Sequence, residues 1–318
     1  MVKKNGVISL GEALIDFIPL DDTNTTYQKS PGGAPANVAV GVARLGAKSS
    51  FLGKVGEDVL GKFMKETLAS FGVETSQMSF TKDVRTGAVF VTLAENGERS
   101  FDFYIEPSAD RFLEAGDINE QEFTSHKILH FGSISMISGP SVEATQHAVQ
   151  LAKESGMVIS YDPNLRLNLW PSEEQARDTI LSMMGHADVV KISEEELEFL
   201  TGEKDMDTGV KKLEGYEIPF LLVTLGSEGS YVFTKDGSKK VPAMKVKTVD
   251  TTGAGDAFVS SILYGVHEFD GDITELTSEE AAEMARFAAV SGALAASTKG
   301  AMTALPTLEE VQNRLQRS

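Results

Sequence analysis

Residues 250–258 read Asp-Thr-Thr-Gly-Ala-Gly-Asp-Ala-Phe and lie between a strand-like segment, 245–249, and a helix-like segment, 257–263. The small residues Gly253, Ala254 and Gly255 therefore stand at a predicted helix N-terminus. Glycines there let backbone N–H groups approach a ligand closely, and the helix dipole places about half a positive charge at the same point. The pattern predicts an anion site that suits a phosphate group.

Asp256 follows these small residues directly, at the place where phosphate oxygens would gather. Its negative charge opposes anion binding, which favours a chemical role for the carboxylate. We interpret Asp256 as a general base that takes a proton from an attacking hydroxyl, while N–H groups and a metal ion hold the phosphoryl group. The alternative is a plain helix start in which Asp256 offsets the helix dipole.

The same stretch also comes close to a dinucleotide-binding fingerprint. Phe258 stands where that fingerprint needs its third glycine, and a phenylalanine would crowd the helix against its strand. Such fingerprints usually open a first βαβ unit, whereas this stretch lies about four-fifths of the way along the chain. We therefore set aside dinucleotide binding, and an oxidoreductase with it.

A second glycine-rich motif, Gly-Gly-Ala-Pro-Ala-Asn, begins at Gly32 and Gly33. The paired glycines let the backbone approach a ligand, Pro35 presets a first helical turn, and Asn37 offers both a donor and an acceptor. This chemistry suits a sugar hydroxyl. The alternative is a Gly-Pro helix start with Asn37 on a solvated face.

Together, residues 32–39 and 250–258 resemble the two signatures of the ribokinase-like (PfkB) carbohydrate kinases. Further segments fall in the family's order, at residues 11–16, 162–166, 191–196 and 224–226. The resemblance therefore covers essentially the whole chain. Within the family, fructokinases are the most similar, by residues 32–37, 107–110 and 162–171.

The resemblance implies an ATP-dependent sugar kinase that transfers the γ-phosphoryl group to a primary hydroxyl, with fructose as the expected sugar. A 2-keto-3-deoxygluconate kinase, a ribokinase or a nucleoside kinase would share the phosphate-site residues, so these remain alternatives. A catalytically inactive sugar-sensing regulator would lose the base, and the presence of Asp256 argues against it. Fructokinases often carry Arg-Asn where this chain has Ile105-Glu106, and we interpret Glu106 as a substrate-facing carboxylate that disfavours acidic sugars.

The resemblance also implies roles for single residues. Asp16 is expected to accept hydrogen bonds from two adjacent sugar hydroxyls, and Arg166 to clamp the sugar or the transferring phosphoryl group; an exposed surface side chain is the alternative for each. The residues implied for substrate binding are Asp16, Gly32, Gly33, Asn37, Phe103, Arg166 and Asp256. Those implied for ATP binding are Lys191, Ser193, Glu196, Thr224, Gly226, Gly229, Gly253, Gly255 and Gly300.

Two metal sites follow from the same resemblance. Glu196 falls where the family places a carboxylate that orders the magnesium-bound phosphates, and we expect it to act through water. The alternative is that residues 194–196 form the acidic first turn of a helix capped by Ser193. Asp250 and Thr252 resemble the start of a monovalent-cation loop, where potassium would brace the anion site.

Short apolar runs typical of buried parallel strands alternate with helix-like segments. These runs cover residues 7–10, 50–52, 128–131, 158–161, 189–192 and 220–223. They predict one α/β domain over residues 1–318, with a central mostly parallel sheet, helices on both faces and ligands at the carboxyl ends of the strands. Residues 13–30 and 85–105 alternate polar and apolar positions, and with a hairpin signal at 95–98 they predict a small β lid over the sugar.

The composition of the chain argues against several classes of partner and of chemistry. The formal charge of −18 disfavours nucleic acids, and the absence of cysteine excludes disulfides and thiolate chemistry. No run of about 18 apolar residues is present, so we expect no membrane span and a cytoplasmic protein. Lids pair in some members of the family, and a homodimer through the lid is therefore a further expectation.

Overall fold

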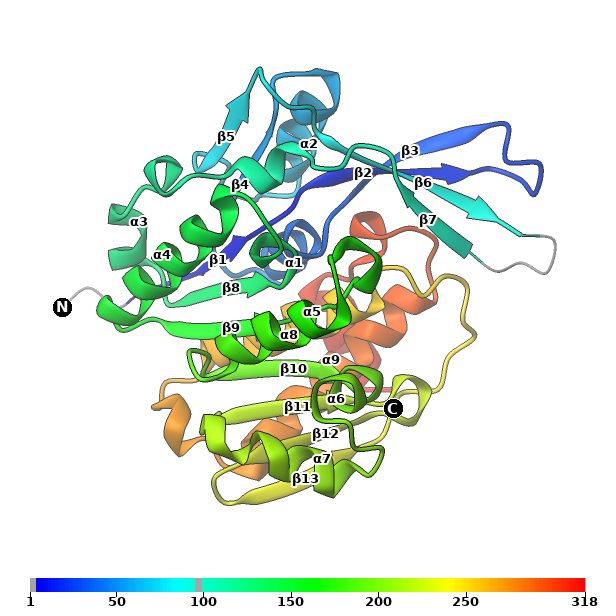
Figure 1. Ribbon diagram of the computed structural model, residues 1–318. Coiled ribbons are helices and arrows are strands. Elements are labelled where there is room, and N and C mark those ends of the chain that lie inside the picture. Colours follow the sequence, from blue (N-terminus) through cyan, green and yellow to red (C-terminus); the bar gives the residue numbers. More distant parts are fainter. Residues whose placement is uncertain (1–3, 95–98, 318) are drawn as a thin grey trace.

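Nine strands form the larger of two sheets in the computed structural model, which describes residues 4–94 and 99–317 (Figure 1). The strand order is β13-β12-β11-β10-β9-β8-β1-β4-β5, and every neighbouring pair is parallel except β11–β12 and β12–β13. The strands are β1 (Val7–Leu10), β4 (Ser49–Gly56), β5 (Met78–Thr81), β8 (Ile128–Gly132), β9 (Val158–Asp162), β10 (Val189–Ser193), β11 (Phe220–Thr224), β12 (Ser230–Thr234) and β13 (Gly237–Val241). The six apolar runs of the sequence are confirmed as the adjacent strands from β4 to β11.

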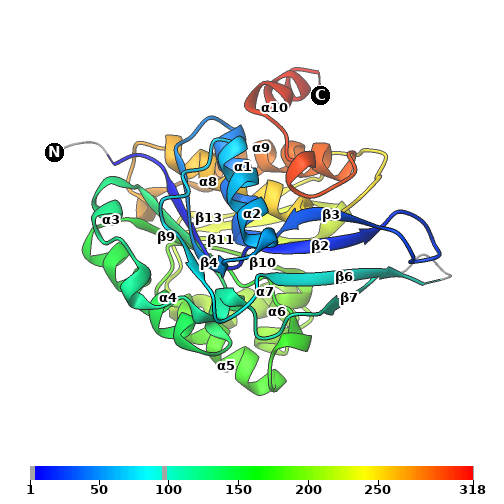
Figure 2. The same cartoon turned by 90° about the horizontal axis from the view of Figure 1, so that it is seen from above.

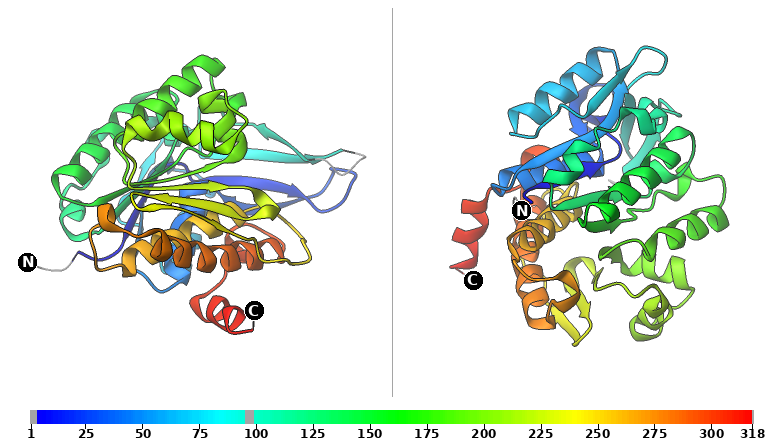
Figure 3. Two further views of the ribbon diagram at one scale, coloured as in Figure 1. Left: turned by 90° about the horizontal axis from the view of Figure 1, so that it is seen from below. Right: turned by 90° about the vertical axis from the view of Figure 1, so that its left-hand side faces the viewer.

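Helices cover both faces of this large sheet, as Figures 2 and 3 show. One face carries α4 (Pro140–Glu154), α5 (Glu173–Met184), α6 (Glu194–Thr201) and α7 (Met206–Leu213); the other carries α1 (Ala34–Arg44), α8 (Ala254–Glu268) and α9 (Ser278–Ala296). The remaining helices are α2 (Val59–Ser70), α3 (Gln121–Ser125) and α10 (Leu308–Leu315). Within residues 4–94 and 99–317, no helix combines the length and apolar character needed to cross a bilayer.

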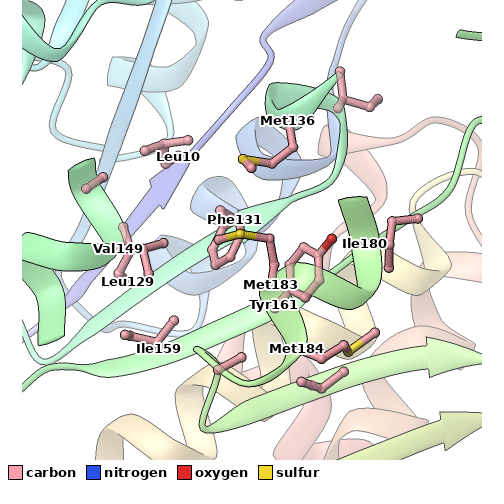
Figure 4. Packing of buried hydrophobic residues seen from close by; sticks show 14 of the residues in the cluster. Leu10, Leu129, Phe131, Met136, Val149, Ile159, Tyr161, Ile180, Met183 and Met184 are labelled. Atoms are coloured by element: carbon pink, nitrogen blue, oxygen red, sulfur yellow. The ribbon is translucent and has the colours of Figure 1, made fainter. Parts of the chain in front are cut away.

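Strand residues alternate between two apolar cores. Leu221 and Val223 belong to the core beneath α4–α7, whereas Phe220 and Leu222 belong to the core beneath α8 and α9. Figure 4 shows the first core, in which the ring of Phe131 stacks on Tyr161 with a centroid distance of 4.6 Å. Both faces of each central strand are thus buried, which is why the sequence shows continuous apolar runs there.

A second, small sheet of four strands projects from one end of the large sheet (Figures 1 and 2). Its order is β3-β2-β6-β7, from β2 (Leu14–Pro19), β3 (Tyr27–Gly32), β6 (Gly87–Leu93) and β7 (Arg99–Phe103). Pairing is antiparallel for β2–β3 and β6–β7 and parallel for β2–β6. The small β lid is therefore confirmed. The predicted hairpin turn at 95–98 lies outside the described residues.

The segment 245–249 is irregular, so the strand predicted there is wrong. Val249 is exposed, and its N–H donates to the carbonyl oxygen of Ala296 at 2.8 Å, at the end of α9. The chain bonds to a helix end here instead of to a neighbouring strand, although its alternating valines and lysines have a strand-like period. Short 3₁₀ turns link other elements: η1 (Ala109–Phe112), η2 (Ala115–Asp117), η3 (Ile134–Met136), η4 (Leu167–Leu169), η5 (Glu214–Tyr216), η6 (Gly226–Glu228), η7 (Ile273–Glu275) and η8 (Met302–Ala304).

Candidate active site

A cavity of about 750 Å³ lies between the small sheet and the carboxyl ends of the central strands. It is lined by β2, β6 and β7 on one side, and by the starts of α1 and α8 and the loop after β9 on the other. Of the residues predicted from the sequence, it brings together Asp16, Gly33, Asn37, Phe103, Arg166, Thr252, Gly253, Gly255 and Asp256.

The start of α8 is built as the sequence predicts. Gly253 is the N-cap residue, and its φ of 78° lies in the left-handed region that favours glycine. The Cα of Gly255 faces open space, since a Cβ atom added there would meet no heavy atom within 4 Å. Because both glycines line the cavity, the positive end of the helix dipole faces that space.

Asp256 joins the two glycine-rich motifs. Its Oδ2 accepts a hydrogen bond from Asn37 Nδ2 at 2.7 Å, and this bond links the first turn of α8 to α1. Burial raises the pKa of Asp256 to about 6, although the Asn37 hydrogen bond acts in the opposite direction. The carboxylate is therefore charged at neutral pH and still basic enough to accept a proton.

Asp16 lies on β2, half-buried, on the face of the small sheet that lines the cavity. An exposed loop aspartate, the alternative left open by the sequence, is thereby excluded. Burial, and after it the negative charge of Asp256, raises the pKa of Asp16 to about 7, whereas Arg166 lowers it. A Cβ atom at Gly32 would overlap Asp16 Oδ2, so the glycine leaves room for this carboxylate.

Arg166 is exposed and lines the cavity. Its Nη1 donates to the carbonyl oxygen of Leu165 at 3.1 Å, which directs the guanidinium back along the loop after β9. The positive charge lowers the pKa of Glu12, Asp16 and Asp256 alike. Arg166 is thus both a surface residue and the cation that acts on these three carboxylates of the cavity.

Lys191 and Asp162 form an ion pair beside the cavity, with 3.3 Å between Nζ and Oδ1. Burial alone would lower the pKa of Lys191, but the carboxylates of Asp162 and Glu196 outweigh it, and the pKa is raised. The lysine therefore remains charged at the carboxyl end of β10, where a polyphosphate would need a cation.

Glu196 adopts the helix-capping arrangement that the sequence left open. Its Oε2 accepts from Ser193 N and its Oε1 from Leu165 N, both at 2.8 Å, while Ser193 Oγ accepts from Glu196 N at 3.1 Å. This capping box starts α6. Burial raises the pKa of Glu196, and Lys191 opposes that rise.

The other residues implied for ATP binding follow the neighbouring strand, outside the lining of the cavity. Thr224 ends β11 directly opposite Ser193 in the sheet register, and Gly226 and Gly229 form the turn into β12. A Cβ atom at Gly229 would overlap Val241 O, so this glycine is also needed for packing.

Asp250 is buried and binds two turns together. Its Oδ1 accepts from Thr252 N at 3.0 Å and from Thr252 Oγ1 at 2.7 Å, and its Oδ2 accepts from Gly300 N at 3.3 Å. The residues that precede α8 are thereby held to the turn around Gly300. Across the described residues, no group of three or more His, Cys, Asp or Glu side chains is arranged to hold a metal ion.

Glu106 does not face the cavity, so its interpretation as a substrate-facing carboxylate is wrong. Its Oε1 pairs with Arg111 Nη2 at 3.1 Å, and it lies outside the cavity lining. Arg111 is only 1% exposed and also donates to Ser138 Oγ at 3.0 Å. Strand β7 ends at Phe103, and the chain then returns to the main body, where a buried guanidinium needs a carboxylate.

Several cavity residues were not predicted from the sequence. The carboxylate among them is Glu12, which is buried, and burial raises its pKa to about 8. Leu14, Val89, Phe101, Asn164 and Asn168 also line the space. Glu12 stands two residues after the buried strand β1, within segment 11–16, and that position is the one signal that could have identified it.

Comparisons with known proteins show which family the chain resembles. The pattern of the pfkB family carbohydrate kinases matches residues 4–308. The chain is 47% identical over 317 residues to "Probable fructokinase-6, chloroplastic" of Arabidopsis thaliana, covering 97% of this chain and 82% of that protein. A solved structure of fructokinase with bound ATP from Xylella fastidiosa has a TM-score of 0.92 and 36% identity, covering 99% of each chain.

A fructokinase double mutant from Vibrio cholerae O395, in a form with fructose, ADP and potassium ion bound, has a TM-score of 0.89 and 41% identity, covering 97% of each chain. These likenesses extend over both sheets, so the fold is the ribokinase-like layered fold with its small β lid. Both glycine-rich motifs lie inside the matched range, and the Asn37–Asp256 hydrogen bond brings them together. The chain belongs to the pfkB family of carbohydrate kinases.

Proposed function

We propose that the protein is an ATP-dependent fructokinase, which transfers the γ-phosphoryl group of ATP to a primary hydroxyl of fructose. The observation that carries the proposal is the position of Asp256 between the N-terminus of α8 and the Asp16 and Asn37 side chains. An anion site, a base and sugar-binding groups then share one cavity. The relatives named above are fructokinases, and one of them binds fructose and ADP.

Asp256 acts as the general base. With a pKa of about 6 it is ionised at neutral pH and can take the proton of the attacking hydroxyl. Backbone N–H groups of Gly253, Ala254 and Gly255 stabilise the charge on the transferring phosphoryl group, assisted by the helix dipole. Asn37 occupies Oδ2, which leaves Oδ1 of Asp256 for the sugar hydroxyl.

Asp16 and Asn37 hold the sugar. The Asp16 carboxylate accepts from two adjacent hydroxyls, in keeping with its place on the cavity face of β2. Asn37 is 5% exposed, and its Oδ1 has no hydrogen-bond partner among residues 4–94 and 99–317. A buried acceptor of this kind is usually satisfied, and a sugar hydroxyl would satisfy it. Phe103 covers the sugar from the lid, and Arg166 supplies positive charge.

ATP lies along the carboxyl ends of β10 and β11, with Lys191 near its phosphates and with Ser193, Thr224, Gly226, Gly229 and Gly300 bordering it. Magnesium fits Glu196 through water, because each carboxylate oxygen has accepted only one N–H and retains a lone pair. Bound magnesium would neutralise phosphate charge.

A potassium ion fits the turns that Asp250 and Thr252 organise. The carboxylate of Asp250 accepts three hydrogen bonds from its own chain, so backbone carbonyls would supply most of the cation's ligands. Such an ion would fix the backbone that leads into Gly253.

We further propose that residues 1–318 form one domain, that the protein is cytoplasmic, and that it dimerises through the lid. The outer face of the lid carries an aromatic cluster in which Tyr104 contacts Phe90 edge-on at a centroid distance of 5.5 Å, and Tyr104 is 70% exposed. Light scattering of the protein and of a Tyr104→Ser variant tests the dimer. Cell fractionation tests the location.

The test of the proposed function is a panel of fructose, 2-keto-3-deoxygluconate, ribose and adenosine with direct measurement of ADP. We expect fructose to give the highest kcat/KM. A higher value for the acid sugar, ribose or the nucleoside would make the fructokinase assignment wrong and leave the kinase chemistry standing. No ADP release above background with any acceptor would reject the kinase itself, and the inactive sugar-sensing regulator would then be the better proposal.

A further inference from the structure

Glu12 holds the start of a helix that belongs to a different segment of the chain. Its side chain lies in the turn between β1 and β2, is 4% exposed, and accepts at Oε1 from Ala34 N at 3.0 Å. Ala34 is the first residue of α1, and the N-cap residue Gly33 has no side chain with which to cap that N–H. Glu12 therefore does from a distance what an N-cap side chain does locally.

The first turn of α1 is also packed tightly against the same β1–β2 turn. A Cβ atom at Gly33 would overlap the carbonyl oxygen of Glu12, and a Cβ atom at Gly11 would collide with the ring of Pro35. The beginning of α1 is thus fixed relative to the end of β1 by a hydrogen bond and by two close contacts. One turn further along α1, Asn37 Nδ2 donates to Asp256 Oδ2 at 2.7 Å.

We propose that Glu12 is a positioning residue: by holding the N-terminus of α1, it keeps the Asn37 amide against the base Asp256. The inference rests on the proposed function, because it concerns the base of that reaction. Glu12 acts through two hydrogen bonds in series: Ala34 N donates to Glu12 Oε1, and Asn37 Nδ2, on the same helix, donates to Asp256 Oδ2. A residue that does not contact the reacting groups can therefore also determine how the base Asp256 is held.

The charged groups around Glu12 and Asp256 favour an action of Glu12 through the two hydrogen bonds over a direct electrostatic effect of its carboxyl group on Asp256. Besides burial and the Asn37 hydrogen bond, Asp162 raises the pKa of Asp256 and Arg166 and Lys191 lower it, while Asp256 raises the pKa of Asp16. These are the main charged groups that face the base, from β9 and its following loop, β10 and the lid.

Glu12 itself faces Asp110, which raises its pKa, and Arg166, which lowers it, but burial is the dominant cause and brings the pKa to about 8. At neutral pH Glu12 is therefore mostly protonated and adds little charge to the cavity. A neutral carboxylic acid still accepts from Ala34 N through an oxygen, so the positioning bond does not require ionisation.

The experiment compares Glu12→Ala and Glu12→Gln in pH profiles of kcat and kcat/KM for fructose. Without Glu12, Asn37 is no longer held against Asp256, and loss of its hydrogen bond raises the pKa of the base. The base must be deprotonated, so the acidic limb of the profile should move to higher pH in Glu12→Ala, by about one unit. We expect kcat at pH 7 to fall by about 10- to 100-fold, mainly because the base is no longer aligned with the hydroxyl, and the fructose KM to rise by a few-fold, because Asn37 is also proposed to bind the sugar.

Glu12→Gln should recover most of the lost activity and return the acidic limb toward its wild-type position, because the amide oxygen can accept from Ala34 N. The matched control is Asp58→Ala, which removes a carboxylate that caps α2 through Leu60 N and Gly61 N and also accepts from Thr86 N, each at 2.9 Å, with all three donors outside the cavity lining. Helix α2 carries none of the proposed site residues, so this variant should lose thermal stability without moving the acidic limb.

A double variant tests the order of the two bonds. In an Asn37→Ala background, Glu12→Ala should add no further shift of the acidic limb, since the amide on which it acts is already gone. A second full shift would overturn the inference, and so would a rise in fructose KM without movement of the limb, which indicates direct sugar contact. If the acidic limb of Asp58→Ala shifted by the same amount, general destabilisation would explain the shift in Glu12→Ala, and the inference would be overturned.

A structural measurement separates this inference from the proposed function. If the wild type turns over no sugar, the proposed function fails, but a crystal structure of Glu12→Ala still tests the positioning. We expect Asn37 Nδ2 and Asp256 Oδ2 to move beyond hydrogen-bonding distance. An unchanged separation of 2.7 Å would refute the role of Glu12 whatever the activity.

Discussion

Replacing Asp256 by asparagine should remove the base and leave the cavity intact. Asparagine has the same shape, and its side-chain oxygen can take the place of Oδ2 in accepting from Asn37 Nδ2. Its NH₂ group then faces the sugar hydroxyl, where it can donate a hydrogen bond but cannot accept the proton. The backbone N–H groups at the start of α8 are unaffected, so phosphate binding should persist.

The magnitude follows from the role of the base. General-base catalysis contributes about 10²- to 10⁴-fold, which is roughly 3 to 5 kcal/mol of transition-state stabilisation. We therefore expect kcat to fall by that factor, with ADP affinity unchanged within about twofold. At saturating fructose, the wild-type kcat should also decline about tenfold per pH unit below the pKa of about 6 of Asp256, and the variant should lack this limb.

The free energy of unfolding of Asp256→Asn is the control that shows whether this variant folds normally. The pKa of Asp256 is raised in the folded protein, so its ionised form opposes folding at every pH above the ordinary aspartate range, and protonation relieves the cost as the pH falls. At pH 8, the neutral asparagine should therefore increase the free energy of unfolding, by about 1–2 kcal/mol after allowance for solvent screening of a half-buried group. Chemical denaturation at pH 8 measures this change.

Direct quantification of ADP by chromatography between pH 5 and pH 8.5 is the appropriate assay, because coupling enzymes have pH dependences of their own. Calorimetric titration with ADP reports nucleotide binding in parallel. A variant with kcat within about threefold of the wild type, or one that keeps the acidic limb near pH 6, would refute the assignment of Asp256 as the base.

Three further outcomes are expected. Replacing sodium by potassium at constant ionic strength should increase kcat in cation-depleted protein, because an ion at the turns of Asp250 and Thr252 would brace the start of α8; indifference to the exchange would count against that site. Asp16→Ala should raise the fructose KM by at least about tenfold and leave basal ATP hydrolysis unchanged within about twofold, and in the wild type KM should rise below pH 7 as Asp16 becomes protonated. Glu106→Gln should leave the ratio of kcat/KM for fructose and 2-keto-3-deoxygluconate unchanged, because Glu106 pairs with Arg111; a shift toward the acid sugar would restore the interpretation that the structure contradicts.

Parts of the fold that are buried on both faces could be predicted from the sequence alone. The central strands carry continuous apolar runs because helices cover each side, and the lid strands alternate because Leu14 and Asp16 face the cavity while Ile15 and Phe17 face away. The segment 245–249 has the same local period without a strand beside it. Periodicity reports what a strand would bury, and it does not report whether a partner strand exists.

The candidate site shows the same limit. The sequence could single out Asp256 and Asn37 as candidates because each lies in a short motif whose chemistry is carried by consecutive residues. The interpretation of Glu106 is wrong because the sequence does not show its ion pair with Arg111. That pair forms where the chain returns from the small sheet to the main body. Glu12 was overlooked for a related reason: a single carboxylate after a buried strand has no pattern around it, and its partner Ala34 is 22 positions away.

The Asn37–Asp256 hydrogen bond joins residues that are 219 positions apart, and this separation has a consequence during synthesis. At about 5–20 residues per second, roughly 10 to 40 seconds pass between the emergence of one partner and that of the other. Over that interval α1 has no α8 to pack against, and the Asn37 amide has no carboxylate to hold. The ribosome-bound chain therefore carries Asp16 and Asn37, which we propose bind the sugar, before Asp256 has been made, and by the proposed mechanism it cannot consume ATP until then.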